Sequence, residues 1–195
     1  MTLSNYTEPI PGFFIYDDVL LDSKNFIEEL ELETKKRNLN WGFGGTHNSY
    51  GKKVIDLSTR NVFSVKIPFD SNEDDLFLFK TSNKLKNLFT PYEEYYKEMF
   101  YLETKTHEPY LVLKYRKGQY FNNHLDDHIE TPRRMSLIYY CNDDYEGGEI
   151  EFSKFNLTIR PKANQLFLFP SSYVYQHKVL PITGGVRYAI VSFVY

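Results

Sequence analysis

The segment "NQLFLFPSSYVYQHKVLPITGGVRYAIVSFV" (164–194) shows most clearly how this chain folds. Three short runs within it, 164–170, 174–180 and 186–194, are rich in β-branched and aromatic residues. Proline, serine and glycine lie between the runs, which is typical of turns that connect strands. None of the runs shows the 3.6-residue period of an amphipathic helix. The segment therefore predicts three consecutive strands.

Four more runs of the same kind precede this segment. They are "YLVLKYR" (110–116), "RRMSLIYYC" (133–141), "EIEF" (149–152) and "NLTIR" (156–160). Short strands that follow one another without helices between them predict an antiparallel sandwich or barrel. We therefore expect a mainly β fold in the second half of the chain.

The first half of the chain carries helical signals instead. Residues 22–37 have the pattern of an amphipathic helix, with Asp22 or Ser23 as its N-cap. A second helix is predicted to begin at Thr90, because Pro91 would then occupy the first helical position, where proline is favoured. We expect the two helices to cover the outer face of the sheet.

Two stretches between these helices are less regular. "WGFGGTHNSYGKK" (41–53) holds four glycines and no regular period. A loop of this length is either a functional lid or a disordered segment, and both interpretations stay open. "TRNVFSVKIPF" (59–69) is compatible with one short strand.

Composition narrows the possible classes of protein. The chain has 195 residues, of which 42% are hydrophobic, so we expect a single domain with helical and lid elements in 1–108 and a strand core in 109–195. Its net charge of −3 gives no basic footprint for nucleic acid. The single cysteine, Cys141, rules out an internal disulfide, which suits a reducing cytoplasm. No signal peptide and no apolar run long enough to cross a membrane are found.

Metal-capable side chains concentrate in "GQYFNNHLDDH" (118–128). In an extended chain residues i and i+2 face the same side, so His124 and Asp126 are expected to point together. His177 lies within an otherwise apolar strand, and Arg187 opens the last strand. Taken one at a time, these residues have ordinary explanations as a polar loop, a neutral buried histidine and a surface charge.

One chemistry uses all four residues. Two neutral imidazoles and a carboxylate on one face of Fe(II) leave adjacent coordination positions open. A dicarboxylic keto acid that chelates such an ion also needs an anchor for its far carboxylate. The planar guanidinium of an arginine provides two parallel hydrogen bonds for that purpose.

Three segments then resemble a known family, the Fe(II)/2-oxoglutarate-dependent dioxygenases, and within it the prolyl 4-hydroxylase-like branch. They are "YRKGQYFNNHLD" (115–126), "RRMSLIYYCNDDYEGGEIEF" (133–152) and "LFLFPSSYVYQHKVLPITGGVRYAIVSF" (166–193). The resemblance implies a double-stranded β-helix, which is a two-sheet jelly roll, with the N-terminal helices packed on one sheet. It also implies Fe(II), the cosubstrate 2-oxoglutarate and O₂, with ascorbate as a candidate reductant.

The resemblance assigns roles to individual residues. The H-x-D pair and His177 correspond to the iron ligands. Arg187 corresponds to the residue that binds the far carboxylate of 2-oxoglutarate, assisted by the hydroxyl of Tyr115, and Tyr140 lines the same pocket. Arg133 falls where the family often places an arginine that contacts the substrate.

The chain departs from the family pattern on the substrate side. Phe121 stands where peptidyl-proline hydroxylases tend to have tyrosine, and Phe193 stands where tryptophan is common. The expected reaction is hydroxylation of an unactivated C–H bond on a protein or peptide side chain, most simply proline. A free amino acid, another small molecule or a nucleobase remains the alternative substrate. A cupin-like metal-binding module without oxygenase activity is a third hypothesis, which Arg187 and Tyr115 disfavour.

Other conspicuous residues have ordinary explanations. Asp127 is expected to face solvent, and His128 is expected at the rim of the site rather than among its ligands. His47 and His107 have no ligand spacing with other residues and are interpreted as ordinary surface or packing histidines. Gly147 and Gly148 are predicted to make a tight turn between strands.

Overall fold

The computed structural model describes most of the chain. The described residues are 3–36, 41–47, 53–69, 75–127 and 132–195. The expectation for His128 and the central part of the predicted loop 41–53 lie outside the described residues.

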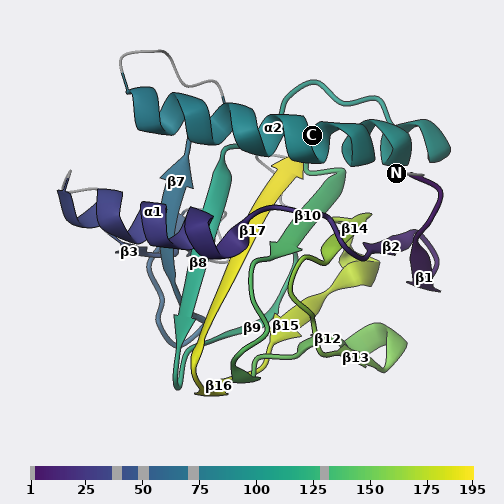
Figure 1. Ribbon diagram of the computed structural model, residues 1–195. Coiled ribbons are helices and arrows are strands. Elements are labelled where there is room, and N and C mark those ends of the chain that lie inside the picture. Colours follow the sequence, from purple (N-terminus) through teal and green to yellow (C-terminus); the bar gives the residue numbers. More distant parts are fainter. Residues whose placement is uncertain (1–2, 37–40, 48–52, 70–74, 128–131) are drawn as a thin grey trace.

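Two antiparallel sheets face each other and form the body of the protein (Figure 1). The major sheet has the strand order β1 (Thr7–Ile10), β2 (Phe13–Tyr16), β14 (Leu166–Pro170), β10 (Met135–Tyr140), β17 (Val186–Val194), β8 (Tyr110–Arg116), β7 (Phe63–Ile67) and β3 (Gly42–Phe43). The minor sheet has the order β13 (Leu157–Ile159), β12 (Ile150–Phe152), β15 (His177–Val179), β9 (Tyr120–His124) and β6 (Arg60–Asn61). Two short ribbons complete the strands, β11 (Glu146–Gly147) with β16 (Ile182–Gly184) and β4 (Thr46–His47) with β5 (Lys53–Val54).

From β8 onward the chain passes back and forth between the two sheets. Strands β8, β10, β14 and β17 belong to the major sheet, whereas β9, β12 and β15, which lie between them in sequence, belong to the minor sheet. This alternation is the predicted double-stranded β-helix. All seven predicted strands are present, but 174–180 begins with a 3-10 turn (Tyr173–Tyr175), and a second such turn (Ser153–Phe155) follows β12.

Both faces of the major sheet are buried, which explains why its strands are almost continuously apolar. In β10, Met135, Leu137 and Tyr139 belong to the hydrophobic cluster on the helix side. Ile138 and Tyr140 alternate with them and belong to the cluster between the two sheets. The period of two in the strand thus divides its side chains between two cores.

Helices α1 (Ser23–Lys36) and α2 (Leu76–Met99) lie across the outer face of the major sheet (Figure 1). Phe26 and Leu30 of α1 and Phe89 and Tyr96 of α2 are buried in the cluster on that side. The prediction that two helices cover the sheet is confirmed, and α1 begins and ends close to its predicted limits.

The predicted start of the second helix is wrong. Its N-cap is Asp75, whose carboxylate accepts hydrogen bonds of 3.1 Å from the backbone N–H groups of the second and third helical residues. Thr90 and Pro91 lie inside the helix, with Pro91 on its exposed side. A stripe of buried residues from Leu85 to Tyr96 continues through the proline. Packing of this stripe against the sheet therefore outweighs the cost of an internal proline, which is about 3 kcal/mol.

The N-terminal half also contains strands that sequence reasoning missed. β1 and β2 have four residues each, too few for a clear period, and β2 gains its place by pairing with β14. The stretch 59–69, predicted as one short strand, forms two strands in different sheets, because the chain crosses from β6 to β7 at Val62. The stretch 41–53, predicted as an irregular loop, contributes residues to β3, β4 and β5.

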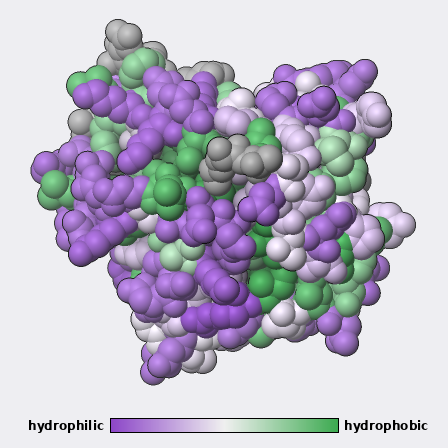
Figure 2. All heavy atoms as spheres, turned by 45° about the vertical axis from the view of Figure 1, so that its right-hand side comes forward, coloured by the Kyte–Doolittle hydropathy of each residue, from purple (hydrophilic) through white to green (hydrophobic). Residues whose placement is uncertain are grey.

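The surface is mainly polar. On the face drawn in Figure 2, hydrophilic side chains dominate and hydrophobic ones gather in small separate patches. Within the described residues, neither helix combines the length and the apolar character that a membrane span requires.

Candidate metal centre

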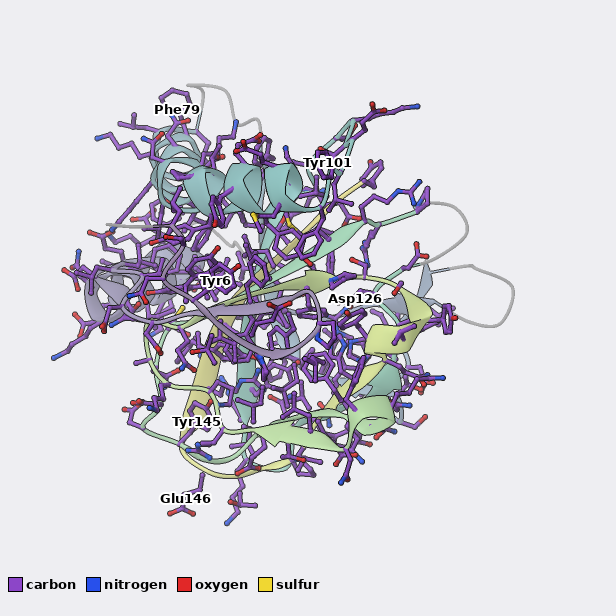
Figure 3. The ribbon with its side chains drawn as sticks, turned by 90° about the vertical axis from the view of Figure 1, so that its right-hand side faces the viewer. Tyr6, Phe79, Tyr101, Asp126, Tyr145 and Glu146 are labelled. Atoms are coloured by element: carbon purple, nitrogen blue, oxygen red, sulfur yellow. The ribbon has the colours of Figure 1, made fainter. Side chains whose placement is uncertain are left out.

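The two histidines and the aspartate singled out from the sequence converge at one end of the sandwich. β15 pairs with β9 so that His177 lies opposite His124. Nε2 of His124 is 3.6 Å from Oδ1 of Asp126, and Nε2 of His177 is 3.9 Å from Oδ2. A metal ion with ligands at about 2.1 Å brings pairs of ligand atoms to about 3–4 Å from each other. Asp126 lies at the edge of the sandwich, away from the turn that carries Glu146 (Figure 3).

Backbone carbonyls orient both imidazole rings. Nδ1 of His124 lies 2.8 Å from the carbonyl oxygen of Asn122, and Nδ1 of His177 lies 3.0 Å from that of Tyr175. A carbonyl can only accept, so each Nδ1 carries the proton and donates it. In the neutral rings Nε2 keeps its lone pair and faces the carboxylate, which is the arrangement that metal-binding histidines need.

The electrostatics of the three groups suit a cation. Burial raises the pKa of Asp126, but His177, His124 and a hydrogen bond from Ser136 outweigh it, so the pKa lies well below its usual range. Burial, assisted by the proximity of His124, lowers the pKa of His177 to about 4. At neutral pH the set therefore offers one carboxylate and a neutral His177, the donor chemistry of a divalent transition metal.

Hydroxyl groups hold the carboxylate in place. Oγ of Ser136 donates a hydrogen bond of 2.7 Å to Oδ2 of Asp126 and lies 2.7 Å from Oγ of Ser171. Arg133 donates from Nη1 to the backbone oxygen of Asp126 at 2.9 Å. The loop residue Asp126 is thus tied to the rigid strands of the major sheet.

Arg187 is the second feature of the site. It lies opposite Tyr115 in the β17–β8 pairing and is only 2% exposed. The carbon of its guanidinium is 5.0 Å from the ring centres of both Tyr115 and Tyr140. Nη1 donates to the backbone oxygen of Gly148 at 3.3 Å. The expectation that a charge at this position faces water in an ordinary protein does not hold here.

Several donors around Arg187 are buried without partners. They are Nε of Arg187 and the hydroxyls of Tyr140 and Tyr145, none of which has a hydrogen-bond partner among the described residues. Burial raises the pKa of Tyr140 and of Tyr115, so both hydroxyls keep their protons. Buried donors that are left unpaired destabilise a protein, so this pocket is complementary to an acceptor and above all to a carboxylate.

Tyr145 and Gly148 are site residues that sequence reasoning missed. Gly148 has a φ of +69°, and a Cβ there would lie 2.4 Å from Cδ1 of Ile182 and 3.5 Å from Cδ of Arg187. The predicted turn is present at Gly147 and Gly148. The backbone oxygen of Gly148 also accepts a hydrogen bond from Arg187. The only signal in the sequence is the run of turn-forming residues that surrounds Tyr145.

A cavity of about 1160 Å³ extends from the metal-site residues to Arg187. Phe121 lines it and stacks on His124, with ring centres 3.4 Å apart and an angle of 8° between the planes. Arg133 also lines it, but its Nε and Nη2 form a two-pronged ion pair with Glu108 at 2.6 and 2.8 Å. Phe193 lies 3.7 Å beneath its guanidinium. Arg133 and Phe121, the two residues predicted to contact the substrate, therefore both lie at the cavity.

Two of the remaining expectations can be compared with the structure. Asp127 does not simply face solvent, because it is half-buried at the cavity wall and its Oδ1 is buried without a hydrogen-bond partner among the described residues. The loop after Asp126 is held by a hydrogen bond from the backbone of Asp127 to that of Ser171 (3.1 Å), which turns the side chain inward. His107 is a packing residue as expected, and its Nε2 lies 3.0 Å from Oε1 of Glu93.

Comparison with known sequences agrees with this geometry. The family described as the 2OG-Fe(II) oxygenase superfamily matches residues 110–195. A PKHD-type hydroxylase of Synechococcus sp. (strain JA-2-3B'a(2-13)) is 34% identical over 94 residues, which cover 43% of this chain and 41% of the relative. Procollagen-lysine,2-oxoglutarate 5-dioxygenase 1 of Mus musculus is 42% identical over 53 residues, covering 27% of this chain and 7% of that protein. The chain thus spans less than half the length of these relatives.

Comparison with solved structures extends the similarity in fold to almost the whole chain. A prolyl hydroxylase from Trichoplax adhaerens, in complex with a hypoxia inducible factor peptide fragment, has a TM-score of 0.68 at 18% identity, covering 94% of this chain and 83% of that one. A Pseudomonas putida prolyl-4-hydroxylase has a TM-score of 0.64 at 18% identity, covering 98% and 94%. At such identities the likeness shows the fold, a double-stranded β-helix with helices on one sheet.

Proposed function

We propose that the protein is an Fe(II)- and 2-oxoglutarate-dependent dioxygenase that hydroxylates an unactivated C–H bond, on the premise that residues 110–195 match the 2OG-Fe(II) oxygenase superfamily. One observation carries the proposal. A His-Asp-His set that suits a metal ion shares a cavity with a buried arginine, and donors around this arginine have no hydrogen-bond partners among the described residues.

The metal is assigned to His124, Asp126 and His177. Two neutral imidazoles and one carboxylate on one side of Fe(II) leave the positions that face the cavity open to other ligands. When bound, iron and 2-oxoglutarate together activate O₂ for oxidation of a C–H bond. The protein contributes the fixed Nε2 atoms and the Ser136-bound carboxylate, so the ligands need little rearrangement to receive the ion.

Arg187 is assigned to the far carboxylate of 2-oxoglutarate. Its Nε has no hydrogen-bond partner among the described residues, and the ring centres of Tyr140 and Tyr115 each lie 5.0 Å from its guanidinium carbon. We propose that Tyr115 donates to the same carboxylate and that Tyr140 and Tyr145 complete the wall. Charge-assisted hydrogen bonds are the strongest available to such an anion in a dry pocket.

A cupin-like module that only binds metal would have no use for this pocket. A buried cation without a counter-ion costs several kcal/mol, and a metal site alone does not offset that cost. A dicarboxylate cosubstrate does offset it, because the anion supplies the missing partner.

For the substrate we propose a protein or peptide side chain, most simply proline. The cavity of about 1160 Å³ exceeds the 300–1000 Å³ that is usual for pockets that take one small molecule. The structurally similar Trichoplax adhaerens enzyme is bound to a peptide. We propose that Arg133 donates its remaining N–H groups to a substrate backbone carbonyl, that Phe121 shapes the floor, and that residues 41–53 act as a lid over the peptide.

For the compartment, the single thiol of the chain supports a proposal. Cys141 is buried in the cluster on the helix side, and burial raises its pKa, so it is an unreactive packing residue. We propose that the protein acts in a reducing cytoplasm, with its sheets and helices forming one domain.

The test is turnover of 2-oxoglutarate by the Fe(II)-loaded protein, measured as succinate formation. Proline-containing peptides should stimulate succinate formation and gain 16 mass units, whereas free proline, free lysine and nucleosides should not. If a free amino acid or a nucleoside stimulates succinate formation and every peptide is inert, the substrate is a small molecule rather than a peptide. Absence of turnover with any compound, together with absence of 2-oxoglutarate binding, would contradict the dioxygenase proposal.

A further inference from the structure

A second arginine, Arg60, reaches the same cavity from the minor sheet. β6 pairs with β9 so that Arg60 lies opposite Phe121. The carbon of its guanidinium is 4.7 Å from the centre of the Phe121 ring, which in turn stacks on His124. Only one aromatic ring therefore separates this cation from a metal-site histidine.

Contacts with the backbone of two glycines hold Arg60 in position. Nη1 donates a hydrogen bond of 2.6 Å to the backbone oxygen of Gly45. At Gly44 a Cβ would lie 2.8 Å from Nε of Arg60 and 3.0 Å from Cζ, so the backbone of this glycine packs directly on the guanidinium. Gly44 and Phe121 thus both pack against the guanidinium.

The cation is incompletely paired. Its Nε is buried and has no hydrogen-bond partner among the described residues. None of the ion pairs between described residues includes Arg60, whereas Arg133 in the same cavity forms a two-pronged ion pair with Glu108. The charged side chains that act on Arg60 are Asp126, which favours its charge, and Arg133, which opposes it.

When Fe(II) and 2-oxoglutarate are bound, the other charges of the site balance one another without Arg60. The two positive charges of Fe(II) and that of Arg187 are matched by Asp126 and the two carboxylates of 2-oxoglutarate, and Arg133 is matched by Glu108. Asp127 also lines the cavity, but it forms no ion pair with Arg60 and is not among the groups that act on it. A half-buried guanidinium in such a position is complementary to an anion that arrives from outside.

We propose that Arg60 is a specificity-determining residue that binds a carboxylate of the substrate, so that the enzyme selects an acidic peptide. This inference rests on the proposed function and names the substrate class of that site. Exposed apolar side chains at the cavity, Phe43, Ile55 and Leu125, supply a surface for the rest of the peptide. The carboxylate belongs either to an aspartate or glutamate side chain or to the C-terminus of the peptide.

The experiment compares matched proline-containing peptides. One set is amidated and carries aspartate, asparagine or lysine beside the proline, and a second set without acidic residues has a free or an amidated C-terminus. Wild type is compared with Arg60→Gln, Arg60→Glu and Arg60→Lys. Arg134→Gln, which removes an equal charge at an exposed position, is the matched control. The readouts are kcat/KM for hydroxylation and, independently of turnover, the Kd of each peptide for Mn(II)-loaded protein without O₂.

Wild type should favour the carboxylate-bearing peptide by about tenfold to a hundredfold, as expected for hydrogen bonds to a charged group. The preference should disappear in Arg60→Gln, reverse towards lysine in Arg60→Glu, persist in part in Arg60→Lys and be unchanged in Arg134→Gln. Dependence on Arg60 in the amidated set would identify a side-chain carboxylate, and dependence only in the second set would identify the chain end.

Two outcomes overturn the inference and separate it from the proposed function. If wild type hydroxylates acidic and neutral peptides equally, or if Arg60→Gln keeps the acidic preference, the role of Arg60 is wrong while the dioxygenase proposal stands. If no compound supports 2-oxoglutarate turnover and none binds, the proposed function fails first. Thermal unfolding of each variant shows whether it is folded. If Arg60→Gln does not fold, Arg60→Lys is used in its place.

Discussion

The two faces of the major sheet differ in whether their buried cations have a counter-ion among the described residues. On the helix side, Lys114 of β8 is 7% exposed and contacts Glu31 of α1 at 2.5 Å. Nε2 of His107 on the same side lies 3.0 Å from Oε1 of Glu93 of α2. On the inner face, Arg187 of β17 is more deeply buried and has no carboxylate partner among the described residues. The outer face completes its ion pairs within the protein, whereas the inner face leaves a cation for a ligand.

Tyrosines show why charge, and not burial alone, marks the site. Tyr139 faces the helices and its hydroxyl donates to Asn164 at 2.7 Å, while its neighbour Tyr140 faces inward and its hydroxyl has no partner in the described part of the chain. Yet the hydroxyls of Tyr16 and Tyr110 on the helix side also lack a partner there. A neutral hydroxyl without a partner is a modest cost that a packed core tolerates. An unpaired guanidinium is a larger cost, and its persistence indicates a function.

The largest expected effect concerns the proposed metal ligands, which lie on β9, on β15 and in the loop after β9. His177→Ala should weaken Fe(II) or Mn(II) binding by more than the roughly 100-fold that loss of a supporting residue causes, because it removes a ligand itself. Asp127→Asn, next to the site but not assigned as a ligand, should bind metal like wild type. Calorimetric titration with Mn(II) measures both. Equal affinity in His177→Ala and wild type would show that the third ligand is misassigned.

Removal of the inner cation should separate ligand binding from stability. Arg187→Leu should lose about 2–5 kcal/mol of 2-oxoglutarate binding, and so more than tenfold in affinity, while metal binding remains. Its free energy of unfolding without ligands should not fall, because the lost cation had no counter-ion. Tyr115→Phe should weaken 2-oxoglutarate by about 0.5–1.5 kcal/mol. Unchanged 2-oxoglutarate affinity in Arg187→Leu would contradict the anchor role.

The paired cation of the outer face should behave in the opposite way. Lys114→Met should destabilise the protein by about 1–3 kcal/mol, because Glu31 loses the partner that compensates its burial. Urea unfolding of the ligand-free protein measures the effect. If Lys114→Met and Arg187→Leu changed stability equally, the contrast between the two faces would be wrong.

The same pair predicts a pH dependence. Burial raises the pKa of Glu31, but hydrogen bonds from Lys114 and Tyr188 outweigh it and lower the pKa below its usual 4.5. The stabilisation is therefore complete above about pH 4.5 and is lost as the pH falls through the lower folded-state value. Glu31→Gln should lower the free energy of unfolding at pH 7 by about 1 kcal/mol, a modest amount because Glu31 is only half-buried. Near pH 3 the loss should be smaller, because Glu31 is then closer to its protonated form. Glu28→Gln, at an exposed position of α1, is the control.

The smallest effect distinguishes two neighbouring tyrosines. Tyr139→Phe should cost about 1 kcal/mol of stability, because its hydroxyl donates to Asn164 in the folded protein. Tyr140→Phe should leave the ligand-free protein as stable as wild type, since its hydroxyl has no partner. Thermal unfolding of the two variants checks this, and a larger loss in Tyr140→Phe would show that its hydroxyl is paired in solution.

The sequence by itself determined the features that depend on neighbours along the chain. Runs rich in β-branched and aromatic residues predicted β8 and β17 to the residue. The H-x-D spacing predicted that His124 and Asp126 point together, because side-chain direction in an extended chain repeats every two residues. The motifs were enough to predict the family whose model matches residues 110–195.

Only the tertiary structure decided which distant groups meet. α2 begins at Asp75 and continues through Pro91, because contact with the sheet outweighs a local signal that favours Thr90. Arg60 enters the cavity because the chain changes sheets at Val62, and no periodicity marks that crossing. Arg133 is paired with Glu108 while Arg187 is not, although both are arginines in strand-like sequence. Counter-ions, burial and unpaired donors are set by contacts between residues far apart in the chain, and local pattern carries no information about them.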